Sequence, residues 1–106
     1  IVTTHFFGAE RARGVALAPG GKIVAFGIYT GGGSGNEQLL LSRYNSDGSL
    51  DKTFDGDGKA SVLMGNFFGV NSGLVQPDGK IVVSGGLGDG FDFNTFIYRL
   101  NADGSL

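Results

Sequence analysis

The sequence predicts an all-β fold built from two copies of one four-stranded antiparallel unit. PGGKIVAFG at 19–27 returns as PDGKIVVSG at 77–85, and RYNSDGSL at 43–50 returns as RLNADGSL at 99–106. Short apolar runs bounded by Gly, Asn and Asp lie between these motifs, which is typical of strands. The 21 glycines among 106 residues fit frequent tight turns. A repeated unit of this size cannot bury its own faces and needs neighbours.

Each repeat is expected to hold four strands. The expected strands are 1–6, 14–18, 22–28 and 38–44 in the first repeat, and 59–64, 73–76, 80–85 and 94–100 in the second. EQLLLSRY at 37–44 contains good helix formers, but its counterpart NTFIYRL at 94–100 is β-branched and aromatic, so both are assigned as strands. We therefore expect two blades, 1–58 and 59–106, within one structural domain.

The connections between strands have the composition of tight turns. In QPDGK, Pro77 presets φ for the first turn position and Gly79 accepts a left-handed conformation. In YNSDGS and LNADGS, Asn45 and Asn101 are expected to cap the turn by bonding to their own backbone. Each repeat should therefore contain hairpins at fixed places.

Four strands in a Gly-rich repeat of roughly 57 residues indicate a β-propeller blade. The succession QPDGKIVVSG at 76–85 and RYNSDGSLDKTFDGDGK at 43–59 resembles the bacterial delta-60 repeat family. The chain departs from that pattern at Gly20, where Asp is usual, and at Ser42, where Ala is usual. The resemblance implies propeller blades of large secreted or surface-attached bacterial proteins, most of which have no assigned activity. It therefore implies an extracellular or cell-surface location.

Two blades alone would leave sheet faces and strand edges open, whereas propellers have about 4–8 blades. The chain begins with Ile1 inside an expected strand and lacks an initiator Met, so we expect a piece of something longer. The propeller would close either through further blades of a longer parent chain or through a homo-oligomer. Heterologous contacts form rings when the rotation closes, and a trimer or tetramer would give six or eight blades.

Composition excludes several classes of function. The net charge of −2 is spread along the chain without a basic stripe, so no nucleic-acid partner is expected. No apolar run reaches the length of a membrane-spanning helix, and no membrane insertion is expected. The absence of Cys excludes disulfides and thiolate metal sites. The Gly-rich stretch 31–35 lacks phosphate-loop spacing and a following helix, and no cofactor is expected.

Two acidic segments are candidate cation sites. Asn45, Asp47 and Asp51 have the spacing of part of a calcium loop, but Arg43 stands at its first position and Phe54 at its last. A structural turn explains the same residues and is preferred.

Asp55 and Asp57 are two nearby carboxylates that suit a hard cation or acid–base catalysis. They lie in the loop that joins the two repeats, where a turn is again the preferred interpretation.

The recurring cations favour a structural role. Lys22 returns as Lys80 and Arg43 returns as Arg99, and the arginine is expected to bond to turn carbonyls or to an acid such as Asp51. His5 is the only histidine, so one chain cannot build a multi-histidine site, and no catalytic residue is assigned.

The long loops 29–37 and 86–93 separate the third and fourth expected strands of each repeat, and binding residues often lie on such loops. Asp89, Phe91, Asp92 and Phe93 could stack on and bond to a sugar or peptide, and packing within the loop is the alternative. The favoured function is a non-catalytic structural and interaction module that binds protein or glycan. The alternatives are a lectin-like propeller and a fragment of a propeller glycosidase or lyase.

Overall fold

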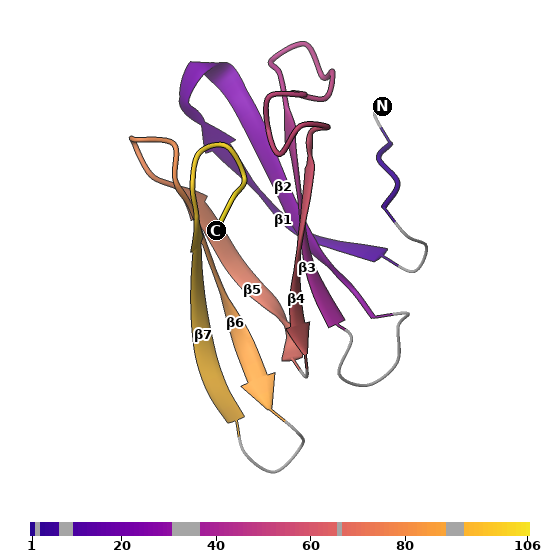
Figure 1. The fold of residues 1–106 in the computed structure, drawn as a ribbon, viewed down its shortest axis with the longest axis vertical. Helices are drawn as coiled ribbons and strands as arrows, with labels where there is room; N and C mark the ends of the chain where they lie inside the picture. The colour runs from indigo at the N-terminus through magenta and orange to yellow at the C-terminus, as the bar shows by residue number, and fades with distance from the viewer. Residues whose placement is uncertain (2, 7–9, 31–36, 66, 89–92) are drawn as a thin grey trace.

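The computed structural model of the chain describes residues 1, 3–6, 10–30, 37–65, 67–88 and 93–106. Two antiparallel sheets pack face to face, which confirms the all-β prediction (Figure 1). The only helical turn in the described residues is the 3-10 turn η1 (Pro19–Gly21). The described part of the chain contains no helix that is long and apolar enough to cross a membrane.

Both sheets are meanders in which each strand pairs with the next one along the chain. The first sheet has the order β1-β2-β3-β4, with bounds Glu10–Ala18, Lys22–Tyr29, Glu37–Tyr44 and Lys59–Gly65. The second has the order β5-β6-β7, with bounds Phe67–Val75, Ile81–Gly88 and Phe93–Leu100.

The sheets divide the chain at a different place from the expected blade boundary at 58. Segment 59–65 was expected to open the second blade, but it forms β4 and pairs with β3 from Ser42 opposite Lys59 to Gln38 opposite Leu63. The loop before it is fixed to β3 by the bond from Arg43 N to Gly58 O (3.0 Å), which delivers the segment to this edge. The first expected strand also differs, because residues 3–6 form no strand. In the part of the chain that the structure describes, the two sheets therefore have four and three strands instead of the expected four and four.

The tight turns form at the predicted places. Gly79 has φ +89 and its N–H donates to Gln76 O (2.8 Å). Gly48 and Gly104 have φ +91 and +92. The predicted Asn caps form in part: Asn101 Nδ2 donates to Leu106 O at 3.3 Å, whereas the carboxylates of the two turns accept the backbone N–H two residues on. These bonds are Ser49 N to Asp47 Oδ1 and Ser105 N to Asp103 Oδ1, both 3.0 Å.

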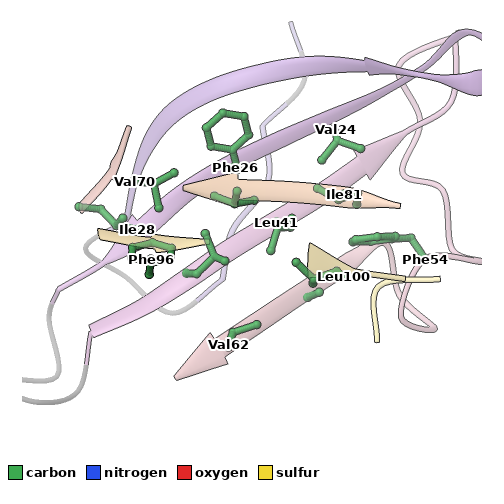
Figure 2. Packing of buried hydrophobic residues seen from close by; sticks show 13 residues of the cluster. Val24, Phe26, Ile28, Leu41, Phe54, Val62, Val70, Ile81, Phe96 and Leu100 are labelled. Atoms are coloured by element: carbon green, nitrogen blue, oxygen red, sulfur yellow. The ribbon is translucent and has the colours of Figure 1, made fainter. Parts of the chain in front are cut away.

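The hydrophobic core lies between the sheets (Figure 2). The Phe26 ring lies against Gly14 of β1 and Gly73 of β5. A Cβ at Gly14 or Gly73 would lie only 2.4 or 2.6 Å from ring carbons of Phe26. Glycine at these positions of β1 and β5 therefore makes room for the ring. The buried hydrophobic residues of the cluster are Val24, Phe26, Ile28, Leu39, Leu41, Phe54, Ala60, Val62, Val70, Ile81, Val83, Phe96 and Leu100.

Equivalent residues of the two repeats do not all face the core. We call the side that the first sheet turns toward the second its forward face, which carries Val24 and Leu41. The side that the second sheet turns toward the first is its rear face, which carries Ile81 and Leu100. By the repeat, Ile97 is the counterpart of Leu41 and lies on the forward face of the second sheet. The sheets thus stack forward face on rear face.

Candidate functional site

Asp51 is the centre of a bonded polar cluster, and its side chain is almost wholly buried. Asp51 Oδ2 accepts hydrogen bonds from Lys22 Nζ at 2.5 Å and from Arg43 Nε at 2.9 Å. Asp51 Oδ1 accepts from Thr53 N at 3.1 Å and Thr53 Oγ1 at 2.6 Å. Four donors therefore satisfy both carboxylate oxygens. We call Lys22, Arg43 and Asp51 the Asp51 cluster.

Strand register and one tight loop bring the cluster together. Arg43 of β3 lies opposite Val24 of β2. Lys22 comes two residues before Val24 in the same strand, so the side chains of Arg43 and Lys22 lie on the forward face together. The chain then turns and returns, because Asp51 N donates to Arg43 O at 2.9 Å. This returning loop places the carboxylate beside both cations.

The loop also places an aromatic ring beneath the guanidinium. Phe54 N donates to Asp51 O at 3.0 Å, and the Phe54 side chain is fully buried. Arg43 Cζ lies 4.7 Å from the centre of the Phe54 ring, which is a cation–π contact.

The Asp51 cluster connects the two repeats. Arg43 Nη1 donates to the carbonyl of Ala102, in the turn that follows β7. Asp55 N donates to Asp103 O at 2.7 Å, and Gly104 lies against the Phe54 ring. The sequence predicts that Arg43 bonds to turn carbonyls or to an acid such as Asp51, and the structure shows a bond of each kind. A hollow of about 260 Å³ beside the cluster is lined in part by the turns that contain Pro19 and Pro77.

The pKa values of Asp51, Asp47 and Asp103 are lowered, which opposes a role in proton transfer near neutral pH. The hydrogen bond from Lys22 is the largest cause that holds the pKa of Asp51 well below its usual range, with Thr53 next. Burial acts in the opposite direction and is outweighed. Hydrogen bonds from Ser49 and Ser105 likewise lower the pKa values of Asp47 and Asp103. These groups remain carboxylates at neutral pH.

The structure places the first set of candidate cation ligands around a lysine. Lys22 Nζ donates to Asn45 Oδ1 at 3.2 Å as well as to Asp51, so two of the three candidate oxygens converge on an ammonium group. Asp47 instead accepts from Ser49 within its own turn. The Ser49 hydroxyl joins this turn together, because it donates to Asp47 Oδ1 at 2.6 Å and accepts from Asn45 Nδ2 at 3.0 Å.

The remaining candidates are not brought into one site. Asp55 and Asp57 are exposed, and Asp57 Oδ1 accepts from Lys59 N at 2.9 Å. Across the described ranges, no group of three or more His, Cys, Asp or Glu residues could hold a metal ion. His5 is exposed, with Nδ1 3.6 Å from Glu10 Oε1.

The candidate ligand-binding residues Asp89, Phe91 and Asp92 lie outside the described residues. Phe93 begins β7, and its side chain also lies outside the described part.

Sequence reasoning missed a second hollow, of about 290 Å³, on the rear face of the first sheet. Residues 3–6 run along this face: Thr4 Oγ1 and the Tyr44 hydroxyl share a hydrogen bond, and Lys59 Nζ donates to His5 O at 3.0 Å. Leu40, Ser42 and Phe6 also line the hollow. Only the expectation of open sheet faces pointed to this surface.

A family model described as "Domain of unknown function (DUF5122) beta-propeller" matches residues 19–54 and 76–106, which together make up more than half of the chain. The chain belongs to the DUF5122 beta-propeller family. The first segment that matches DUF5122 contains all three residues of the Asp51 cluster, and the second contains Lys80 and Arg99. No curated protein and no solved structure matched the chain.

Proposed function

We propose that this DUF5122 chain is a non-catalytic structural and interaction module of a bacterial surface or secreted protein, with repeats of the delta-60 type. The observation that carries the proposal is the Asp51 cluster. Its carboxylate is filled by four donors, and its arginine extends to the turn of the next repeat. In the first repeat, Lys22 and Arg43 are thus used in contacts that hold the structure together.

The binding surface in this proposal is the end of the molecule where β2 meets β3 and β6 meets β7. In Figure 1 these strand ends lie at the same end of the two stacked sheets. A rigid sheet scaffold that brings two variable loops to one end is a common arrangement for recognition. The partner in this proposal is a protein or a glycan, and aromatic stacking on a sugar by Phe91 and Phe93 is the lectin-like form of the same idea.

The glycosidase or lyase alternative needs an acid and a base whose pKa values suit proton transfer near neutral pH. The pKa values of Asp47, Asp51 and Asp103 are all moved in the opposite direction, away from neutrality. None of these three carboxylates therefore has the raised pKa of a general acid.

Binding can be tested by applying the purified chain to an array of bacterial surface oligosaccharides and by calorimetry on any hit. We expect the double variant Phe91→Ala, Phe93→Ala to weaken binding at least tenfold. Lys52→Ala, an exposed change in the loop between β3 and β4, is the control and should bind as the parent does. Release of reducing sugar from the same oligosaccharides would instead support an enzyme, and equal binding by both variants would move the site away from this loop.

A further inference from the structure

The exposed apolar side chains away from the chain ends lie on two sheet faces. In the described residues, the large ones are Val15, Leu17, Leu63, Leu74 and Ile97. Strand alternation puts Val15, Leu17 and Leu63 on the rear face of the first sheet. It puts Leu74 and Ile97 on the forward face of the second sheet.

The two uncovered faces are of the same two kinds as the faces that meet inside the chain. The internal contact joins a forward face to a rear face, and what is left uncovered is one rear face and one forward face. Leu41 is fully buried in the internal contact, whereas its counterpart Ile97 is 74% exposed. Val75 packs against the core, whereas its counterpart Leu17 is 79% exposed. A second copy of this chain therefore offers each uncovered face the partner that it has within the chain.

Residues 3–6 add a backbone element to this match. In the repeat pattern, residues 1–6 are the counterpart of residues 59–64 of β4. In the structure, residues 3–6 lie beside the rear face of the first sheet, and Figure 1 shows them on the opposite side of that sheet from β7. A copy stacked on this rear face would bring its own second sheet next to residues 3–6.

The second sheet has a place for a fourth strand. β4 pairs with β3, but no strand in the described residues pairs with β7 on the side away from β6. We propose that copies of this chain stack head to tail, rear face of the first sheet on forward face of the second, with residues 3–6 of one copy added as the fourth strand to β7 of the other. This interaction is β-strand addition combined with burial of two apolar faces.

The repeat also fixes the register of the added strand. Leu39 of β3 lies opposite Val62 of β4. The counterpart of Leu39 is Thr95, because RYNSDGSL and RLNADGSL lie 56 residues apart. If Ile1 is the counterpart of Lys59, then the counterpart of Val62 is Thr4. Thr4 of one copy should therefore lie directly opposite Thr95 of the other. Side chains in that relation have Cβ atoms about 4.5–5.5 Å apart, close enough for a disulfide after a small adjustment.

The charges at the end of the forward face fit the same arrangement. Arg99 is the counterpart of Arg43 and is exposed. Within the chain, Arg43 donates to the carbonyl of Ala102 in the turn after β7. The counterpart of Ala102 is Ser46, in the turn after β3. Arg99 of one copy is therefore placed to donate to the Ser46 carbonyl of the next.

The chain has no Cys, so single cysteines report cleanly on the contact. Chains carrying Thr4→Cys are mixed with chains carrying Thr95→Cys under mild oxidation, and the linked peptide is identified by mass spectrometry. The control mixes Thr4→Cys with Ser72→Cys, which is exposed on the forward face at the other edge of the second sheet. We expect the Thr4–Thr95 pair to link at least tenfold faster than the control pair.

Equal rates for the two pairs would overturn the proposal, as would absence of any link while both variants keep the parent circular dichroism. Either result would mean that residues 3–6 of one copy are not added to β7 of another. The test does not depend on the ligand of the proposed function, because cross-linking reports on assembly and array binding is measured separately.

Discussion

Ile23 and Ile81 are equivalent residues of the two repeats, yet only Ile81 lies in the core between the sheets. Ile81 is 1% exposed, whereas Ile23 is half-buried on the opposite side of the first sheet. The same residue type in the same place of the pattern is therefore covered in one repeat and available in the other. This relation means that each sheet has two faces built for contact, as expected of a stacked repeat.

The Asp51 cluster should contribute measurably to stability. Asp51→Asn removes the charge that two cations share, and we expect the free energy of unfolding to fall by about 2–3 kcal/mol. Urea denaturation followed by circular dichroism measures this loss. Asp55→Asn makes the same chemical change at an exposed position of the same loop, and should change stability by less than about 0.5 kcal/mol. Equal losses in both variants would contradict the structural role of Asp51.

Stability should depend on pH below about 5. The pKa of Asp51 is lowered in the folded chain, so its contribution is fully present above the unfolded pKa of about 3.9 and is lost as pH falls below it. Urea midpoints at pH 7, 5 and 3 should fall steeply only between the last two. The urea midpoint of Asp51→Asn should fall less between pH 5 and pH 3 than that of the unmodified chain. An equal fall in the two proteins would contradict the role of Asp51 in acid stability.

The contact of Phe26 with Gly73 should be intolerant of a methyl group. Gly73→Ala would place a Cβ 2.6 Å from the Phe26 ring, and we expect a loss of about 1–3 kcal/mol. In the background Phe26→Leu, which replaces the ring by a smaller aliphatic side chain, Gly73→Ala should lower the free energy of unfolding by less. A double-mutant cycle measures this coupling. Additive losses would show that Phe26 is not what excludes the methyl group.

The two recurring arginines should separate folding from assembly. Arg43→Ala removes bonds to Asp51 and Ala102 and the contact with Phe54, so the unfolding free energy should fall by about 2–3 kcal/mol. Arg99→Ala should leave unfolding of the single chain nearly unchanged and weaken association several-fold. Thermal melts at low concentration and sedimentation across a concentration series distinguish the two effects. Matching effects of the two changes on folding would contradict the difference in their surroundings.

Much of the fold follows from the sequence because most segments have a counterpart in the other repeat, against which their assignment can be checked. The strand assignment of EQLLLSRY came from its counterpart and is confirmed by β3. The turns at Pro77–Gly79 and around Gly48 and Gly104 are confirmed for the same reason.

The grouping of strands into sheets could not be read from the repeat alone, because a periodic pattern has no marked beginning. Segment 59–65 could close one blade or open the next, and only its pairing with β3 decides. Phe54 was also missed as a core residue. Its neighbours Asp55, Gly56 and Asp57 have the composition of a loop, and burial depends on the distant turn that contains Gly104.

The most direct test of head-to-tail stacking is the molar mass in solution by light scattering after size exclusion. The parent chain of 10.9 kDa should elute as an oligomer, whereas Leu17→Lys, on the rear face, and Ile97→Lys, on the forward face, should each elute as the single chain. Mixed in equal amounts, the two variants retain one intact rear face and one intact forward face between them, so the mixture should give a dimer and nothing larger. A parent that stays at the mass of one chain at high concentration, or a mixture that fails to form the dimer, would contradict the account.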